Sequence, residues 1–162
     1  MKTFQDLQEG VYDPNILKAF FLAGGPGSGK SYVVKRGTGG LGLKIVNSDD
    51  VFEKYLKDAG LSMKMPKSEE EPRDKLRDRA KAVTKAKMGN YVEGRLGLII
   101  DGTGKDYDKI AKQATQLKQL GYDVHMIFVN TSLETALKRN AERERTVPRS
   151  VATKSWLSLI HI

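Results

Sequence analysis

The stretch LAGGPGSGKSYVV, residues 22–34, decides the fold. The apolar run Lys18–Ala23 predicts a buried strand, and Lys30–Arg36 predicts a short helix that the glycines of residues 37–40 end. Between them, residues 24–31 match the pattern G-x-x-x-x-G-K-[ST]. Glycines let successive backbone N–H groups point inward, and the helix start adds the positive end of its dipole. We therefore expect a loop that holds the phosphates of a nucleotide.

Each residue type in this loop has a physical task. Lys30 can reach the β- and γ-phosphates, and the hydroxyl of Ser31 can ligate Mg²⁺. A chance match within a flexible loop is the alternative, and the strand–loop–helix context argues against it. The residues expected to hold ATP are Gly25, Pro26, Gly27, Ser28, Gly29, Lys30 and Ser31.

The composition predicts one domain with a hydrophobic core. The chain has 162 residues, of which 39% are hydrophobic and 30% charged. The lack of cysteine excludes disulfides and thiolate metal sites and fits a cytoplasmic location. The longest apolar runs are too short to span a bilayer, and residues 1–10 lack a signal-peptide core, so we expect no membrane association. The net charge of +8 is compatible with a polyanionic partner.

Strands and helices alternate along the rest of the chain. Capping boxes are expected at Ser68 with Glu71 and at Thr131 with Glu134. The alternation predicts an α/β fold of three layers, a parallel sheet flanked by helices. A sheet of this type usually has at least one more strand after the arginine-rich helix; the sequence offers none, which fits a truncation at the C-terminus. The predicted strands are Leu43–Asn47, Leu96–Ile100 and Val124–Val129, and the predicted helices are Asp50–Asp58, a segment ending near Met88, Asp108–Leu120 and a segment starting after Thr131.

Acidic residues follow the second predicted strand. In open α/β sheets, the carboxyl ends of the strands face the ligand crevice. There a carboxylate, that of Asp49 or Asp50, could accept or orient the proton of an attacking hydroxyl. Capping of the next helix by Ser48 or Asp49 explains the same residues equally well.

The third predicted strand ends in Asp101-Gly102. An Asp after an apolar strand is a common place to hold Mg²⁺ or its waters. The alternative is a simple turn, because Asp-Gly is a turn sequence.

An arginine-rich run, KRNAERER, occupies residues 138–145 and is followed by TVPR. Arg139 and Arg143 are four residues apart, so on a helix they would share a face. A closing lid that delivers arginines would stabilise charge on a transferred phosphoryl group. The alternative is a solvated face on which Glu142 and Glu144 pair with the arginines.

A basic stripe of Arg73, Arg77, Lys81 and Lys85 recurs every four residues on a predicted helix. The stripe could bind nucleic acid or another polyanion. A solvated face is favoured, because Asp74 and Asp78 lie three residues before Arg77 and Lys81, within reach of ion pairs, and no aromatic residues interleave. His125, which alternates within an apolar strand, is expected to be packed.

The four motifs in this order resemble the P-loop kinases that group phage polynucleotide 5′-kinases with zeta-toxin-like kinases. The matching pieces are GGPGSGKS at 24–31, VNSDD at 46–50, LIIDGT at 98–103 and LKRNAERERTVP at 137–148. The resemblance covers about Phe20 to Trp156 and leaves residues 1–15 outside. It implies a P-loop NTPase fold with an arginine-bearing lid.

The resemblance also implies roles for single residues. Asp49 would be the general base, Asp101 would line the metal and acceptor side, and Arg143 would contact the donor phosphates with Arg139 nearby. In the polynucleotide kinases, an arginine three residues after the base holds the phosphate of the acceptor. Here that position is Phe52, a departure that argues against a nucleic-acid acceptor.

We thus expect an ATP- and Mg²⁺-dependent kinase, zeta-toxin-like, that phosphorylates a hydroxyl of a nucleotide sugar, an oligonucleotide or a small metabolite. A polynucleotide 5′-hydroxyl kinase is one alternative, and a switch that hydrolyses ATP without an acceptor is another. One domain is expected over residues 1–156. The last six residues, LSLIHI, match one reading frame of a common sequencing-library transposon end, so residues 157–162 are expected to be non-native.

Overall fold

The computed structural model describes residues 13, 15–37, 39, 41–104 and 106–160. Predictions for the N-terminal extension 1–12, for Thr38 and Gly40, and for the last two residues of the suspected tail lie outside this range. The described chain forms four strands. They are β1 (Lys18–Ala23), β2 (Lys44–Val46), β3 (Leu98–Asp101) and β4 (Asp123–Phe128).

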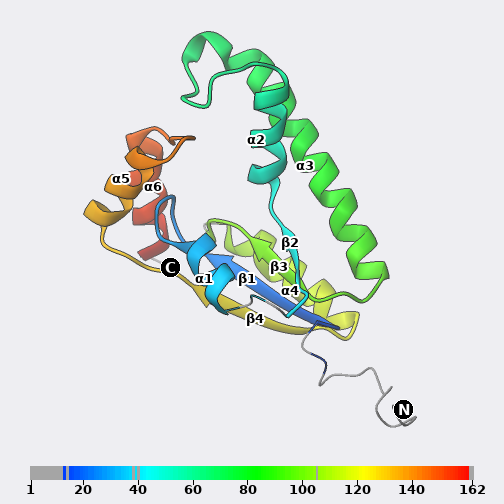
Figure 1. Ribbon diagram of the computed structural model, residues 1–162. Coiled ribbons are helices and arrows are strands. Elements are labelled where there is room, and N and C mark those ends of the chain that lie inside the picture. Colours follow the sequence, from blue (N-terminus) through cyan, green and yellow to red (C-terminus); the bar gives the residue numbers. More distant parts are fainter. Residues whose placement is uncertain (1–12, 14, 38, 40, 105, 161–162) are drawn as a thin grey trace.

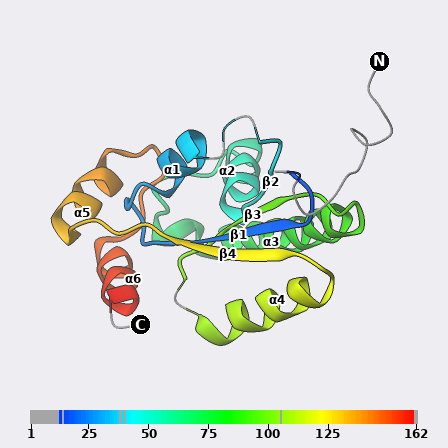
Figure 2. The same ribbon diagram turned by 90° about the horizontal axis from the view of Figure 1, so that it is seen from below.

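The four strands form one parallel sheet in the order β2-β3-β1-β4. Figure 2 shows α4 below the sheet and α1 and α2 above it, which gives the three layers that the sequence predicts. The α/β fold with a parallel sheet is confirmed. The helices are α1 (Lys30–Gly37), α2 (Ser48–Asp58), the 3₁₀ turn η2 (Lys67–Glu69), α3 (Glu70–Glu93), α4 (Tyr107–Gln119), α5 (Leu133–Glu142) and α6 (Arg149–Ile160).

The main core lies between the sheet and α4. Phe21 of β1, Leu98 of β3 and Leu117 of α4 are almost fully buried there, and Met88 and Val92 of α3 pack against them. Burial of these apolar side chains is the main force that holds the helices to the sheet.

A second, smaller core lies between α2 and α3. Figure 1 shows these helices side by side, extending away from the sheet. Phe52 and Leu56 of α2 pack on Ala80 of α3, and all three side chains are at most 1% exposed. Because α2 starts at the end of β2, this core fixes how α2 stands over the sheet edge.

Several predicted helix ends are wrong in detail. No side-chain cap precedes α3: Ser68 lies inside η2, and the expected box with Glu71 does not form. The cap of α5 is Ser132, whose side chain accepts from the backbone N–H of Thr135, and not Thr131. Helix α3 continues five residues past Met88 to Glu93, because Tyr91 and Val92 still pack on the main core.

Strand β4 is more exposed than its apolar sequence predicts. It is an edge strand, and Met126 and Phe128 are 56% and 51% exposed. His125 is exposed too, so its predicted packing in the core is wrong. It stacks on Phe20, and its Nε2 lies 2.9 Å from Oδ2 of Asp123. Among the described residues, no strand follows α5, and no helix is long and apolar enough to cross a lipid bilayer.

We expect Leu56→Ala to lower the free energy of unfolding by about 2–5 kcal/mol, because the side chain is fully buried and its removal leaves a cavity in the second core. Urea denaturation would measure the loss. The matched control is Leu120→Ala, at a leucine that is 58% exposed, where a loss below about 1 kcal/mol is expected. Equal losses for the two variants would contradict the existence of a second core.

Candidate active site

The carboxyl ends of β1, β2 and β3 lead into one cavity of about 510 Å³. It lies where the strand order reverses around β1, the position at which open α/β sheets bind ligands. The structure brings together in its lining every residue that the sequence singled out for the site. These are Gly25, Pro26, Gly27, Ser28, Gly29, Lys30, Ser31, Asp49, Asp101, Arg139 and Arg143.

The glycine loop, residues 24–31, is pressed against α5. Gly27 and Gly29 have φ values of +80° and +103°, which favour glycine. A Cβ at Gly27 would overlap the carbonyl of Ala136 in α5. Ser28 is buried, and within the described residues its hydroxyl has no hydrogen-bond partner. A narrow loop with an unsatisfied polar atom is a suitable cradle for phosphate oxygens.

The amine of Lys30 lies in the cavity against the loop. It donates to the carbonyls of Gly24 at 2.7 Å and Gly25 at 3.3 Å. Burial lowers the pKa of Lys30, the nearby Asp101 opposes this shift, and the positive charge of Arg143 adds to it. Two cations beside a desolvated loop favour a bound anion, so the residues fit a nucleotide phosphate.

Asn47 organises the start of α2. Its Oδ1 accepts from the backbone N–H of Asp49 at 2.8 Å, so Asn47 caps the helix and the alternative of a Ser48 or Asp49 cap is wrong. Its Nδ2 donates to Asp50 and to Asp101, at 3.2 Å each. The sequence interpretation missed this role, although Asn is among the best capping residues. The Asp49 carboxylate is therefore free for another task.

Asp101 ends β3 in a crowded acidic setting. Burial raises the pKa of this carboxyl group, Lys30 opposes the shift, and the charges of Asp49 and Asp50 add to it. Among the described residues, no group of three acidic or histidine side chains could hold a metal ion. Mg²⁺ commonly uses one or two protein oxygens together with waters and substrate phosphates, and Ser31 with Asp101 fit that mode.

The arginine run does not form one helix face. Arg139 belongs to α5, and its Nη1 would lie 3.5 Å from a Cβ at Gly29. Arg143 follows the last helical residue with ψ near 150°, so its predicted place on the helix is wrong, yet both arginines line the cavity. The interleaved Glu144 pairs with Lys57 of α2 at 3.3 Å.

Arg145 is a site residue that the sequence interpretation missed. Its side chain is 8% exposed, its Nη2 lies 2.7 Å from Asp49 Oδ2, and its Nε lies 2.6 Å from Glu53 Oε1. Burial alone would lower the pKa of Arg145, but Asp49 and Glu53 outweigh it and raise that pKa. The high density of arginines after α5 was the only hint in the sequence. Helical spacing could not identify Asp49 and Glu53 of α2 as the partners of Arg145.

The basic stripe on α3 is only partly a solvated face. Lys81 and Lys85 are exposed, and Lys81 pairs with Asp78 at 2.9 Å, as predicted. Asp74 lies 3.9 Å from Arg73 instead of pairing with Arg77. The Arg77 guanidinium carbon lies 4.5 Å from the centre of the Phe52 ring, a cation–π contact between α3 and α2.

We expect Gly27→Ala to weaken ATP binding at least tenfold, because the added Cβ would meet the Ala136 carbonyl in a backbone conformation that disfavours alanine. Calorimetric titration with ATP would measure the change. Gly37→Ala, where nothing lies within 4 Å of the added Cβ, is the matched control and should bind normally. Normal binding by both variants would rule out a constrained phosphate loop.

We expect Asp101→Asn to raise the free energy of unfolding at pH 7. The folded state raises the pKa of Asp101 above its ordinary 3.8, so the ionised carboxylate costs stability at higher pH. This cost is lost as the pH falls through the raised value toward 3.8, and the advantage of the variant should then vanish. Urea denaturation at several pH values would test this. Exposed Asp74→Asn should show no such gain, and a gain independent of pH at Asp101 would refute the explanation.

Solved structures support the observed architecture. The chain is similar to a chain in the Pnkp1/Rnl/Hen1 RNA repair complex, with 21% identity and a TM-score of 0.67 over 90% of this chain and 45% of that one. It is also similar to a chain of AvrRxo1-ORF1:-ORF2 with ATP, with 16% identity and a TM-score of 0.70 over 88% and 47%. A third match comes from the PezAT toxin–antitoxin system of Streptococcus pneumoniae, with 20% identity and a TM-score of 0.57 over 85% and 56%. The chain thus spans about half the length of these solved chains.

No curated protein sequence matches the chain. Residues 20–160 match the family described as AAA domain. That match begins in β1, contains the glycine loop and ends in the last turn of α6, so it includes the whole cavity lining. The chain therefore belongs to the AAA domain family and has a P-loop, kinase-like fold.

Proposed function

We propose that this protein is an ATP- and Mg²⁺-dependent kinase that transfers the γ-phosphoryl group to a hydroxyl acceptor. One observation carries the proposal. The Asp49 carboxylate, released from helix capping by Asn47, lines the same cavity as the glycine loop, Lys30 and Arg143. A carboxylate in reach of a phosphate-binding loop suits phosphoryl transfer, in which the protein mainly positions groups and stabilises charge.

The donor side would be built from the loop. Its backbone N–H groups and the amine of Lys30 would bind the β- and γ-phosphates, and Lys30 would exchange its contacts with the Gly24 and Gly25 carbonyls for phosphate oxygens. Ser31 and Asp101 would hold Mg²⁺, which neutralises phosphate charge when bound. Arg143 and Arg139 would stabilise the charge that spreads over the transferred group.

Asp49 would act on the acceptor. Its Oδ2 is bound by Arg145 at 2.7 Å, while within the described part of the chain its Oδ1 has no such partner. Oδ1 would accept the proton of the acceptor hydroxyl as the hydroxyl oxygen attacks the γ-phosphorus and the bond to the leaving ADP breaks. The product is a phosphate monoester.

The acceptor is proposed to carry an anionic group. Phe52, at the position where the polynucleotide kinases have an arginine, is buried in the second core beneath Arg77, and neither residue lines the cavity. Other arginines line it, and guanidinium groups bind phosphates such as those of a nucleotide sugar or a 5′-hydroxyl oligonucleotide. The structural neighbour named for an RNA repair complex supports the oligonucleotide class.

We expect Asp49→Asn to lower the transfer rate by about 10²–10⁴-fold, the usual contribution of a general base, while ATP affinity changes little. The assay supplies γ-labelled ATP and Mg²⁺ with a 5′-hydroxyl oligonucleotide, nucleotide sugars or small metabolites, and follows the label. Asp58→Asn, at the exposed last residue of α2 and outside the cavity, is the matched control and should transfer at nearly the wild-type rate.

Three results would distinguish the proposal from its alternatives. Transfer by Asp49→Asn at the wild-type rate would show that Asp49 is not the general base. ADP release that no acceptor accelerates would favour an ATP-hydrolysing switch. Label on the oligonucleotide but on no nucleotide sugar would establish the polynucleotide kinase alternative.

A further inference from the structure

The segment Arg143–Pro148 connects α5 to α6, and we call it the strap. Arg143, Arg145 and Val147 of the strap line the cavity. Two of its side chains reach α2. Arg145 bonds Asp49 at 2.7 Å and Glu53 at 2.6 Å, and Glu144 pairs with Lys57 at 3.3 Å. The strap therefore joins the helix that carries the proposed base to the helix that packs on the phosphate loop.

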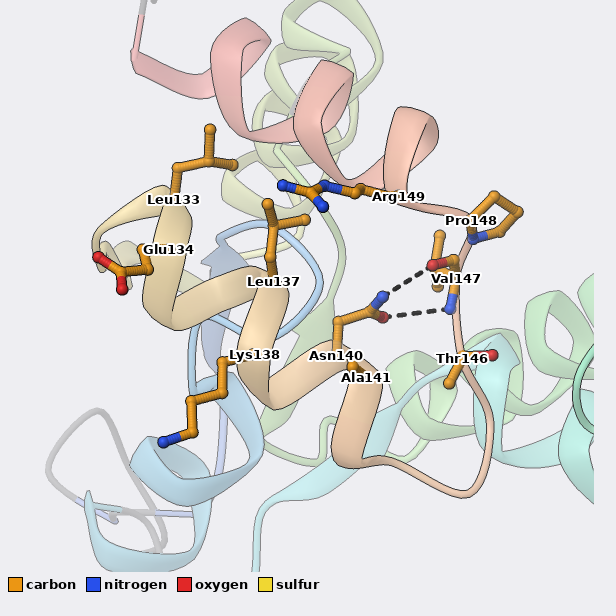
Figure 3. A pocket seen from close by; sticks show the side chains of 10 residues that line it. All are labelled: Leu133, Glu134, Leu137, Lys138, Asn140, Ala141, Thr146, Val147, Pro148 and Arg149. Carbon is orange, nitrogen blue, oxygen red and sulfur yellow. Dashed lines mark hydrogen bonds between the residues drawn. The ribbon is translucent and has the colours of Figure 1, made fainter.

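The strap is also tied to α5. Asn140 Nδ2 donates to the Val147 carbonyl at 2.7 Å, and the Val147 N–H donates to Asn140 Oδ1 at 3.1 Å. Figure 3 shows this pair of hydrogen bonds beside a second cavity that lies between α5 and the start of α6. Asn140 is only 5% exposed, so its amide is committed to the strap and is not available to solvent. These two hydrogen bonds between Asn140 and Val147 fix the loop in which Arg143 and Arg145 lie.

The contacts to α2 differ in strength. Lys57 and Glu144 are 55% and 69% exposed, and a surface pair of this kind contributes little. Arg145 is 8% exposed and meets two carboxylates through two different nitrogens, so its side chain is held in one orientation. The second carboxylate, that of Glu53, lies one helical turn after Asp49. It shares with Asp49 the neutralisation of the positive charge of Arg145.

We propose that Arg145 is a positioning residue of the kinase: it holds Asp49 by Oδ2 and leaves Oδ1 facing the acceptor. This inference rests on the proposed function.

The test is a double-mutant cycle with the full chain. Arg145→Met keeps the length of the side chain and removes its charge, and Arg145→Lys keeps the charge but cannot bridge both carboxylates in the same way. We expect Arg145→Met to lower the transfer rate at saturating ATP at least tenfold, with the ATP dissociation constant within about twofold of wild type. Arg145→Lys should recover part of the rate. In the Asp49→Asn background, Arg145→Met should lower the transfer rate hardly any further, because the carboxylate that Arg145 positions is already absent.

Two further variants serve as controls for the cycle. Arg149→Met removes an exposed arginine four residues away, at the second cavity, and should leave the transfer rate unchanged. Glu53→Gln weakens the hold on Arg145 without touching Asp49 and should lower the rate less than Arg145→Met does. If Arg145→Met does not fold, as judged by its urea transition, the cycle is measured with Arg145→Lys.

The outcomes separate the two proposals. If wild type transfers no label to any acceptor, the proposed function fails and the positioning role fails with it. If wild type transfers label but Arg145→Met and Asp49→Asn have multiplicative effects on the rate, only the positioning role is overturned. A tenfold loss of ATP affinity at an unchanged saturated rate would place Arg145 on the donor phosphates and would also overturn it.

Discussion

The hydrogen bonds of Asn47 are the constraint on which the candidate site depends. One side chain caps α2, bonds Asp50, and reaches Asp101 at the end of a different strand. It thereby fixes the start of the helix that carries Asp49 against the strand that carries Asp101. Because a capped helix has a defined first turn, Asp49 enters the cavity from a fixed direction. Because Asn47 accepts the hydrogen bond at the start of α2, the carboxylates of Asp49 and Asp50 are not needed as caps.

Charge balance explains why so many basic groups surround this acidic centre. Asp101 and Asp50 are both less acidic than usual because of burial and neighbouring carboxylates, and Arg145 sits between Asp49 and Glu53. Lys30 and Arg143 line the same cavity, and the charge of Asp101 acts on Lys30. Cationic and acidic groups therefore share the cavity, which suits a polyanionic donor beside a hydroxyl that must lose a proton.

Much of this could be predicted from sequence, for identifiable reasons. The strand before the glycine loop has a continuous apolar run, and its bounds are those predicted, Lys18–Ala23. The grouping of Asp49, Asp101 and Arg139 in one cavity followed from the rule that parallel strands present their carboxyl ends at one edge. Ser132 and Asn47 were missed as caps because several neighbouring residues were equally good candidates. Arg145 was missed because its partners lie 96 and 92 residues away in the chain, and no local pattern encodes a contact across that distance.

The separation of the two hydrophobic cores has a consequence for how such a protein can diversify. Within the part of the chain that the structure describes, the core between α2 and α3 shares no buried residue with the core beneath the sheet. Substitutions in distant, independent parts of a protein have nearly additive effects on stability. The helical arm beside the proposed acceptor site can therefore be remodelled by mutation without loosening the phosphate loop. Under the proposed function, the acceptor side can thus be altered separately from the side that binds ATP.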